Sequence, residues 1–227
     1  MARVYLCQEN LTDALACAQE VIDSKRFEFM NDSINNVYAY RNLSYIEKMA
    51  RHEYVSSLYV YDLKEGRSDL FFKNLASCEC VIAEGRKASI YSGMGQDLDI
   101  RSKNWFETPA GSATEYVNKY MRGTQIPLLK LSEMYLIAAE ASGDIRYLET
   151  LRANRGYATD PLPAGANLQD EITKEYQKEF IAEGQLFYYY KRRNMAILPI
   201  TSTSMNRATY VLPVPDNELE FGNFKQN

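Results

Sequence analysis

The sequence predicts a mainly α-helical protein, built from helix hairpins and interrupted by an irregular insertion that contains short strands. Two observations support this fold class. Apolar residues recur at the three–four spacing of a helix face on both sides of residues 53–125 of the 227-residue chain. Within residues 53–125, strand-forming residues and glycines replace that pattern. With 46% hydrophobic residues the chain can bury a sizeable core, so we expect residues 1–227 to form one folded unit.

Residues 1–24 are expected to form two antiparallel helices. The chain turns near Glu9 and Asn10, and either Asn10 or Thr12 can cap the second helix. The first residues already have the pattern of a helix interior, which suggests that the natural start of the chain has been removed. The apolar positions of the second helix fall on one face, at Leu11, Ala14, Leu15, Ala18, Val21 and Ile22.

A second helix hairpin is expected at residues 126–155. Ser142, Gly143 and Asp144 turn the chain between its two helices. Small alanine side chains on the first of these helices let a neighbouring helix approach closely, which is typical of tetratricopeptide-like (TPR-like) repeats. The apolar stripe of this helix consists of Leu128, Leu131, Tyr135 and Ala138.

The remainder of the chain is expected to contain one more helix and an extended end. Residues 168–193 have a helical pattern, and their basic run at 191–193 suits the C-terminal end of a helix dipole. Residues 194–227 are expected to be extended, because Pro213 and Pro215 fix the backbone there.

Three glutamates spaced four residues apart raise the alternative of a glycoside hydrolase. Such an enzyme needs two carboxyl groups across an open cleft, one of them with a raised pKa, and helical spacing alone provides no cleft. We therefore interpret Glu175 and Glu179 as solvent-exposed partners of Lys174 and Lys178, and Glu183 as a structural anchor.

Charge and composition exclude several other classes of function. The 30 acidic and 26 basic residues give a net charge of −4, which offers no attraction for nucleic acid or anionic lipid. His52 is the only histidine, which removes most histidine-based chemistry, including a two-histidine metal site, and we expect no metal and no cofactor. No apolar run is long enough for a membrane-spanning helix. Cys78 and Cys80 are interpreted as small semi-buried residues.

Aromatic residues are unusually abundant, with 18 tyrosines, nine phenylalanines and one tryptophan. Flat rings cover the apolar faces of sugars while nearby polar groups bind the hydroxyls, so this composition favours a carbohydrate ligand. The candidate platform residues are Trp105, Tyr91, Tyr59 and Tyr61. A single tryptophan is equally often part of a protein core, and that alternative stays open.

Four segments resemble, in order, motifs of the SusD/RagB family of outer-membrane nutrient-binding lipoproteins. Residues 126–141, IPLLKLSEMYLIAAEA, are similar to the family's "IPLLRLAEMYLIAAEA" helix almost throughout. Residues 178–187, KEFIAEGQLF, followed by Lys191 and Arg192, resemble a second family helix. Residues 212–219, LPVPDNEL, with the closing KQN resemble the family's C-terminal region, and residues 99–106 resemble its "D.R...WF" element.

The resemblance implies a SusD-like fold, of which this chain would be the C-terminal half. It also implies a non-catalytic, lipid-anchored protein at the bacterial outer membrane, which captures oligosaccharides or other nutrients above a SusC-like TonB-dependent transporter. The family motifs imply structural roles for Glu133, Glu140, Glu179, Glu183 and Gly184. The alternative is a TPR-like scaffold that binds another protein and no small molecule.

Overall fold

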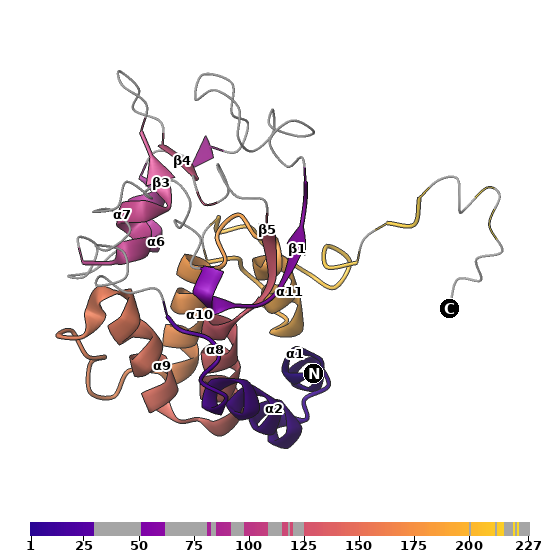
Figure 1. Cartoon of the computed structure of the whole chain (residues 1–227). Coiled ribbons are helices and arrows are strands. Elements are labelled where there is room, and N and C mark those ends of the chain that lie inside the picture. The colour runs from indigo at the N-terminus through magenta and orange to yellow at the C-terminus, as the bar shows by residue number, and fades with distance from the viewer. Residues whose placement is uncertain are drawn as a thin grey trace. The chain divides into compact units, whose positions relative to one another are not determined.

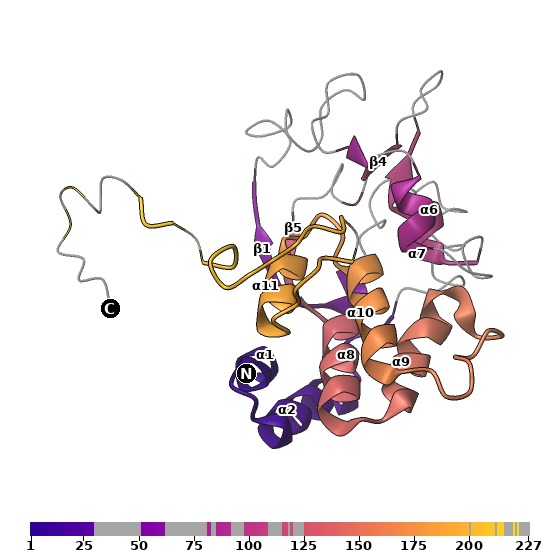
Figure 2. The same cartoon turned by 180° about the vertical axis from the view of Figure 1, so that it is seen from behind.

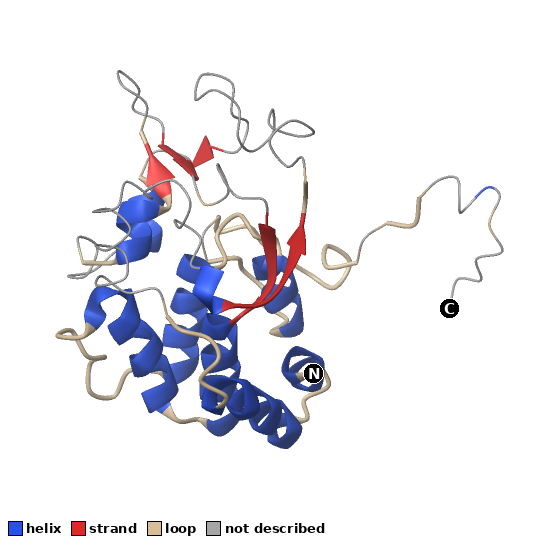
Figure 3. Ribbon diagram, viewed as in Figure 1, coloured by secondary structure: helices blue, strands red, loops and turns tan. Residues whose placement is uncertain are grey.

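The computed structural model describes residues 1–29, 51–61, 81–82, 85–91, 98–108, 115–117, 119, 125–199, 201–211, 213–215, 220 and 222. These residues are mainly helical, with two small antiparallel sheets, which confirms the predicted fold class (Figures 1 and 3). The chain divides into two compact units, Met1–Ala182 and Glu183–Asn227, which are described separately. Cys78 and Cys80 lie outside the described residues.

The first unit begins with the expected helix hairpin, α1 (Ala2–Cys7) and α2 (Leu11–Asp23). Glu9 adopts a left-handed conformation (φ 61°) at the turn, and the Asn10 side chain caps α2 by accepting a hydrogen bond from the Asp13 N–H at 3.2 Å. Ala14, Ala18 and Ile22 form the buried face of α2, so the periodicity of the sequence identified the packing side of this helix. Leu11, expected on the same face, is 46% exposed at the first turn.

Three further helices complete the core of the first unit: α8 (Leu131–Ser142), α9 (Ile145–Arg152) and α10 (Leu168–Glu179). The expected turn is present, because Gly143 (φ 70°) ends α8 and the Asp144 side chain caps α9. Helix α8 packs against α2, α9 and α10, as both views of the chain show (Figures 1 and 2). Ala138 and Ala139 of α8 are completely buried, as the close approach of small residues predicts.

Residues 126–130 belong to a strand and not to the expected helix. Strand β5 (Gln125–Lys130) pairs antiparallel with β1 (Tyr54–Tyr59), with Ser57 opposite Pro127 and Tyr59 opposite Gln125. Leu128 therefore lies on a sheet, 40% exposed, and α8 starts three residues later. The local pattern favoured a helix, but the partner strand lies about 70 residues away along the chain, so its effect could not be read locally.

The insertion contains short strands and short helices, as expected. Strands β2 (Val81–Ile82), β4 (Glu115–Val117) and β3 (Phe106–Glu107) form a sheet in the order β2-β4-β3. Helices α6 (Arg86–Ile90) and α7 (Ile100–Asn104) lie beside this sheet, and a single 3₁₀ turn at Arg51–Glu53 leads into β1 (Figure 3).

The second unit contains α11 (Gln185–Arg192), so residues 168–193 are two helices instead of the single one expected. Ala182 (φ 60°) and Gly184 (φ 73°) both adopt left-handed conformations, which a continuous helix does not allow. The basic run ends α11 as expected. After α11 the backbone forms a bridge between Ile197 and Ser204.

Candidate functional site

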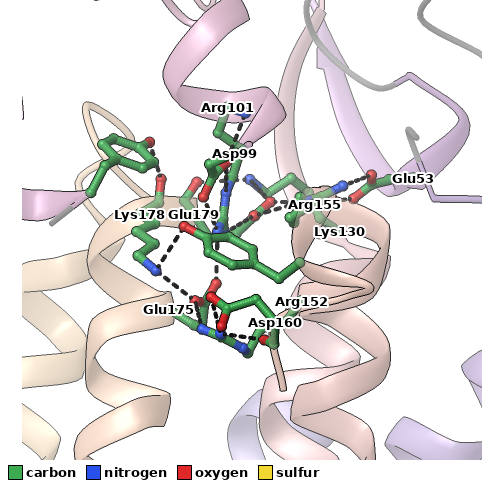
Figure 4. A network of polar contacts seen from close by, with 12 residues as sticks. Glu53, Asp99, Arg101, Lys130, Arg152, Arg155, Asp160, Glu175, Lys178 and Glu179 are labelled. Atoms are coloured by element: carbon green, nitrogen blue, oxygen red, sulfur yellow. Dashed lines mark hydrogen bonds and ion pairs between the residues drawn. The ribbon is translucent and has the colours of Figure 1, made fainter. Parts of the chain in front are cut away.

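The centre of the first unit is a buried network of charged side chains, which we call the charge network (Figure 4). It joins the 3₁₀ turn before β1, the start of α7, the end of β5, the end of α9 and the last two turns of α10. Its members are Glu53, Asp99, Arg101, Lys130, Arg152, Arg155, Asp160, Glu175, Lys178 and Glu179.

Arg101 binds three carboxylates from two parts of the chain. Asp99 caps α7, and its side chain accepts hydrogen bonds from the Arg101 N–H at 2.8 Å and from the Arg101 guanidinium at 2.8 and 3.0 Å. The same guanidinium donates to Glu175 at 2.8 Å and to Glu179 at 3.1 Å. Asp99 and Arg101 are both completely buried, so these contacts attach the start of α7 to α10.

Arg155 is the second buried guanidinium of the network. It forms a two-pronged pair with Glu53, with both N–O distances 2.7 Å, and donates to Glu179 at 3.0 and 3.1 Å. Arg155 lies in the π-helical segment Ala153–Tyr157 that follows α9, where Gly156 has a φ of 106°. The pair with Glu53 therefore holds the entry to β1 against the end of α9.

Three further cations complete the surroundings of the two α10 carboxylates. Lys178 and Arg152 bind Glu175 at 2.9 and 3.4 Å, and Lys130 binds Glu179 at 3.3 Å. The interpretation of Glu175 and Glu179 as solvent-exposed residues is therefore wrong, because both are buried. The helical spacing correctly placed Glu175 and Glu179 on one face of α10. It could not predict that arginines from other elements cover this face.

The surrounding cations keep the two α10 carboxylates ionised. Burial raises the pKa of Glu175, but Arg101, Lys178 and Arg152 more than offset this effect and lower the pKa to about 2. The pKa of Glu179 is likewise held well below its usual range, against burial, by Arg155, Lys130 and Arg101. A general acid needs the opposite shift, so the electrostatics of Glu175 and Glu179 suit a structural role.

Two of the four predicted platform residues are buried beside the network. Trp105 is 3% exposed, and the ammonium of Lys119 lies 3.8 Å from its ring centroid. Tyr91 is completely buried, and its hydroxyl donates to the Lys178 carbonyl oxygen at 3.1 Å. In this structure both rings pack in the interior, which matches the core alternative for the lone tryptophan.

The other two predicted residues lie at the exposed end of β1. Tyr59 is 66% exposed and Tyr61 is 87% exposed, so each ring can reach solvent. The structure thus separates the four candidates into a buried pair near the charge network and an exposed pair at the end of β1 and just after it. Only the exposed pair presents ring surface to a ligand without a change of conformation.

Comparisons with known proteins agree with this architecture. No family model matches the sequence, and no curated protein matches it. Among solved structures, SusD superfamily proteins from Bacteroides vulgatus and Bacteroides thetaiotaomicron align over 97% of this chain, each with 19% identity and with TM-scores of 0.66 and 0.59. The chain has a SusD-like fold. It spans 55 and 57%, respectively, of the length of those two structures.

A third structure with this SusD-like fold is named "Putative sugar binding protein" and comes from Bacteroides vulgatus. It aligns over 96% of this chain and 55% of its own length, with 21% identity and a TM-score of 0.69. At identities of 19–21% the comparisons establish the shared fold.

The residues for which the sequence resemblance implies structural roles have different surroundings. Glu133 of α8 is buried and forms a two-pronged pair with Arg3 of α1, both distances being 2.6 Å, which ties the two helices together. Gly184 supplies the left-handed residue directly before α11. Glu140 and Glu183 are half-buried, and their structural role stays a prediction.

Sequence reasoning missed Glu53 and Arg155 as members of the charge network. Neither lies in a segment that resembles a family motif, and their two-pronged pair joins residues 102 positions apart. Asp99 and Arg101 did carry a local signal, because an Asp two residues before an Arg can both cap a helix and bind the Arg side chain. That signal gave no indication that the pair is buried.

Proposed function

We propose that this chain belongs to the surface-exposed, glycan- or nutrient-binding component of a SusC/SusD-type TonB-dependent uptake system, and that it binds its ligand without catalysis. The observation that carries the proposal is the SusD-like fold over 96–97% of the chain, shared with a protein named for sugar binding. The aromatic composition and the ionised, buried state of the central carboxylates support binding over hydrolysis.

The proposal includes a location and a partner. Its partner would be a SusC-like transporter, and a lipid anchor would hold the protein at the outer surface of the bacterial outer membrane, as the motif resemblance implies. Among the described residues, no helix has the length and apolar character needed to cross a bilayer.

We further propose that Tyr59 and Tyr61 contact the ligand. Their rings are the exposed members of the predicted set, and each joins an apolar face with a hydroxyl that can bind a sugar hydroxyl. Trp105 and Tyr91 would then act from the interior, by supporting the insertion on which they lie.

Binding to a panel of soluble glycans, measured by calorimetry and by retention in polysaccharide gels, tests this function. For a glycan that binds, Tyr59→Ala and Tyr61→Ala should each weaken affinity by roughly tenfold, the loss of one good ring contact. Tyr188→Ala is the matched control, since Tyr188 is 65% exposed, about as much as Tyr59, and is not one of the proposed contact residues. A folded protein that binds no glycan would contradict sugar as the ligand, and unchanged affinity in both variants would contradict the assigned residues.

A protein-interaction scaffold is the second candidate, favoured by the hairpins α1–α2 and α8–α9, which pack side by side in the first unit. Cross-linking in native membranes separates the two functions. A barrel transporter as the cross-linked neighbour supports the uptake system, whereas another protein neighbour together with no glycan binding supports the scaffold.

A further inference from the structure

The described residues of the insertion between β1 and β5 form a cohesive substructure, which we call the arm. It comprises residues 81–82, 85–91, 98–108, 115–117 and 119, and both views show its elements gathered together beside α9 and α10 (Figures 1 and 2). Lys87 binds Glu115 at 2.7 Å and lies 5.0 Å from the ring centroid of Phe106. Tyr91 packs edge-on against Phe106, so the arm has an interior of its own.

Several polar contacts between the arm and the helices converge on the last two turns of α10 and the residues just after it. Arg101 binds Glu175 and Glu179 at 2.8 and 3.1 Å. The Tyr91 hydroxyl donates to the Lys178 carbonyl oxygen at 3.1 Å, and Lys119 donates to the Glu179 carbonyl oxygen at 2.7 Å. These hydrogen bonds differ from apolar contacts, because water can replace each of them when the attachment opens.

The ion pair between Asp99 and Arg101 at the start of α7 has an exposed counterpart at the start of α9. Asp144 caps α9, accepts a hydrogen bond from the Arg146 N–H at 2.9 Å and binds the Arg146 side chain at 2.6 Å, as Asp99 does with Arg101. The Arg146 side chain is 82% exposed, whereas that of Arg101 is completely buried. Capping a helix therefore does not require burial, and the burial of Arg101 reflects its attachment to α10.

We propose that the arm opens from the helices as one unit, and that Arg101 sets how often it opens. Arg101 holds the arm by its bonds to the α10 carboxylates, while the contacts inside the arm survive the opening. This inference concerns the motion of the arm and holds whether or not the ligand is a sugar. Units that open before the rest of a protein unfolds are detected by hydrogen exchange.

Native-state hydrogen exchange of the 227-residue chain, resolved by mass spectrometry, tests the proposal directly. In the wild-type protein the backbone amides of α7 and β3 should exchange through an opening that leaves α8 protected. Arg101→Met should raise arm exchange by at least roughly a hundredfold, since it leaves buried carboxylates without their partner. The amides of α8, which open only on global unfolding, should stay the slower of the two sets. Acrylamide quenching of Trp105, the only tryptophan of the chain, should rise in parallel.

Arg146→Met is the matched control, because it removes the same kind of side-chain ion pair with a capping aspartate, but at an exposed site. In this variant the arm and α8 should both exchange as in the wild type. Unchanged arm exchange in Arg101→Met would overturn the proposal, as would wild-type arm amides that exchange no faster than those of α8. If Arg101→Met does not fold, the wild-type measurement decides: arm and α8 amides that exchange only through one common unfolding event would also overturn it.

Discussion

At the scale of single residues, burial gives two similar ion pairs on α10 very different roles. Glu171 and Glu175 each bind the lysine three residues later, at 2.6 and 2.9 Å. The first pair is solvent-exposed at Lys174, where water screens the attraction and the pair contributes little to stability. The second pair is buried and shares Glu175 with two arginines, so removing that carboxylate leaves several cations without a partner.

Glu175→Gln should therefore destabilise the protein in a pH-dependent way. Because the pKa of Glu175 lies near 2 in the folded protein, below its ordinary value of 4.5, its charge stabilises the fold by about 3 kcal/mol at neutral pH. This contribution is complete above about pH 4.5 and is lost as the pH falls toward 2. Urea denaturation at pH 7 and pH 3 should show a larger difference between the variant and the wild type at pH 7.

Glu171→Gln is the control on the same helix, and its unfolding free energy should stay within about 1 kcal/mol of the wild type at both pH values. A Glu175→Gln penalty that is the same at pH 7 and pH 3, or no larger than that of Glu171→Gln, would contradict the assigned role of the carboxylate.

At the scale of elements, a close backbone contact fixes the arm against the end of α9. A side-chain carbon built on Gly156 would lie 2.1 Å from the Leu98 carbonyl oxygen, far inside van der Waals contact, and Gly156 has a φ of 106°. Leu98 directly precedes the Asp99 cap, so glycine at this position lets the start of α7 reach the charge network.

Gly156→Ala should consequently lower the unfolding free energy by several kcal/mol, the sum of backbone strain and a clash with main-chain atoms. Gly165→Ala is the matched control, because Gly165 also has a positive φ (81°) but has open space around the added carbon. The control should cost only the strain, about 1 kcal/mol. Equal losses in the two variants, measured by urea denaturation, would show that the contact with Leu98 adds nothing.

The elements also show which parts of the fold local sequence can predict. The hairpin α1–α2 and the turn at Gly143 follow from spacing, capping and a glycine, all of which act within a few residues. Strand β5 did not follow, because its pairing with β1 depends on a distant segment. The break before α11 was missed for another reason: Ala182 adopts a left-handed conformation that its residue type does not favour.

At the scale of the whole molecule, the chain combines a small net charge with an interior that is strongly charged. The net charge of −4 gives little long-range repulsion, while the first unit buries three arginines and several carboxylates in one connected set. Sequence composition predicted the first property and could not predict the second. Counting charges does not show which of them meet, and Glu53 and Arg155 meet only because the fold brings distant segments together.

Salt should therefore have little effect on the stability that the charge network provides. Raising NaCl from about 0.1 to about 1 M shortens the screening length from about 10 to about 3 Å, but buried pairs are screened far less than exposed ones. The stability difference between Arg101→Met and the wild type should be about 3–5 kcal/mol at both salt concentrations. The smaller difference caused by Arg146→Met should disappear at high salt, because the Arg146 side chain is 82% exposed.

Using differences between variant and wild type removes the general effect of salt on folding, which acts on all three proteins alike. Urea denaturation at the two salt concentrations provides the measurement. If the Arg101→Met penalty fell sharply in 1 M NaCl, water and ions would have to reach the network in the native state. The arm would then be open for much of the time, and the buried guanidinium could not be what holds it to α10.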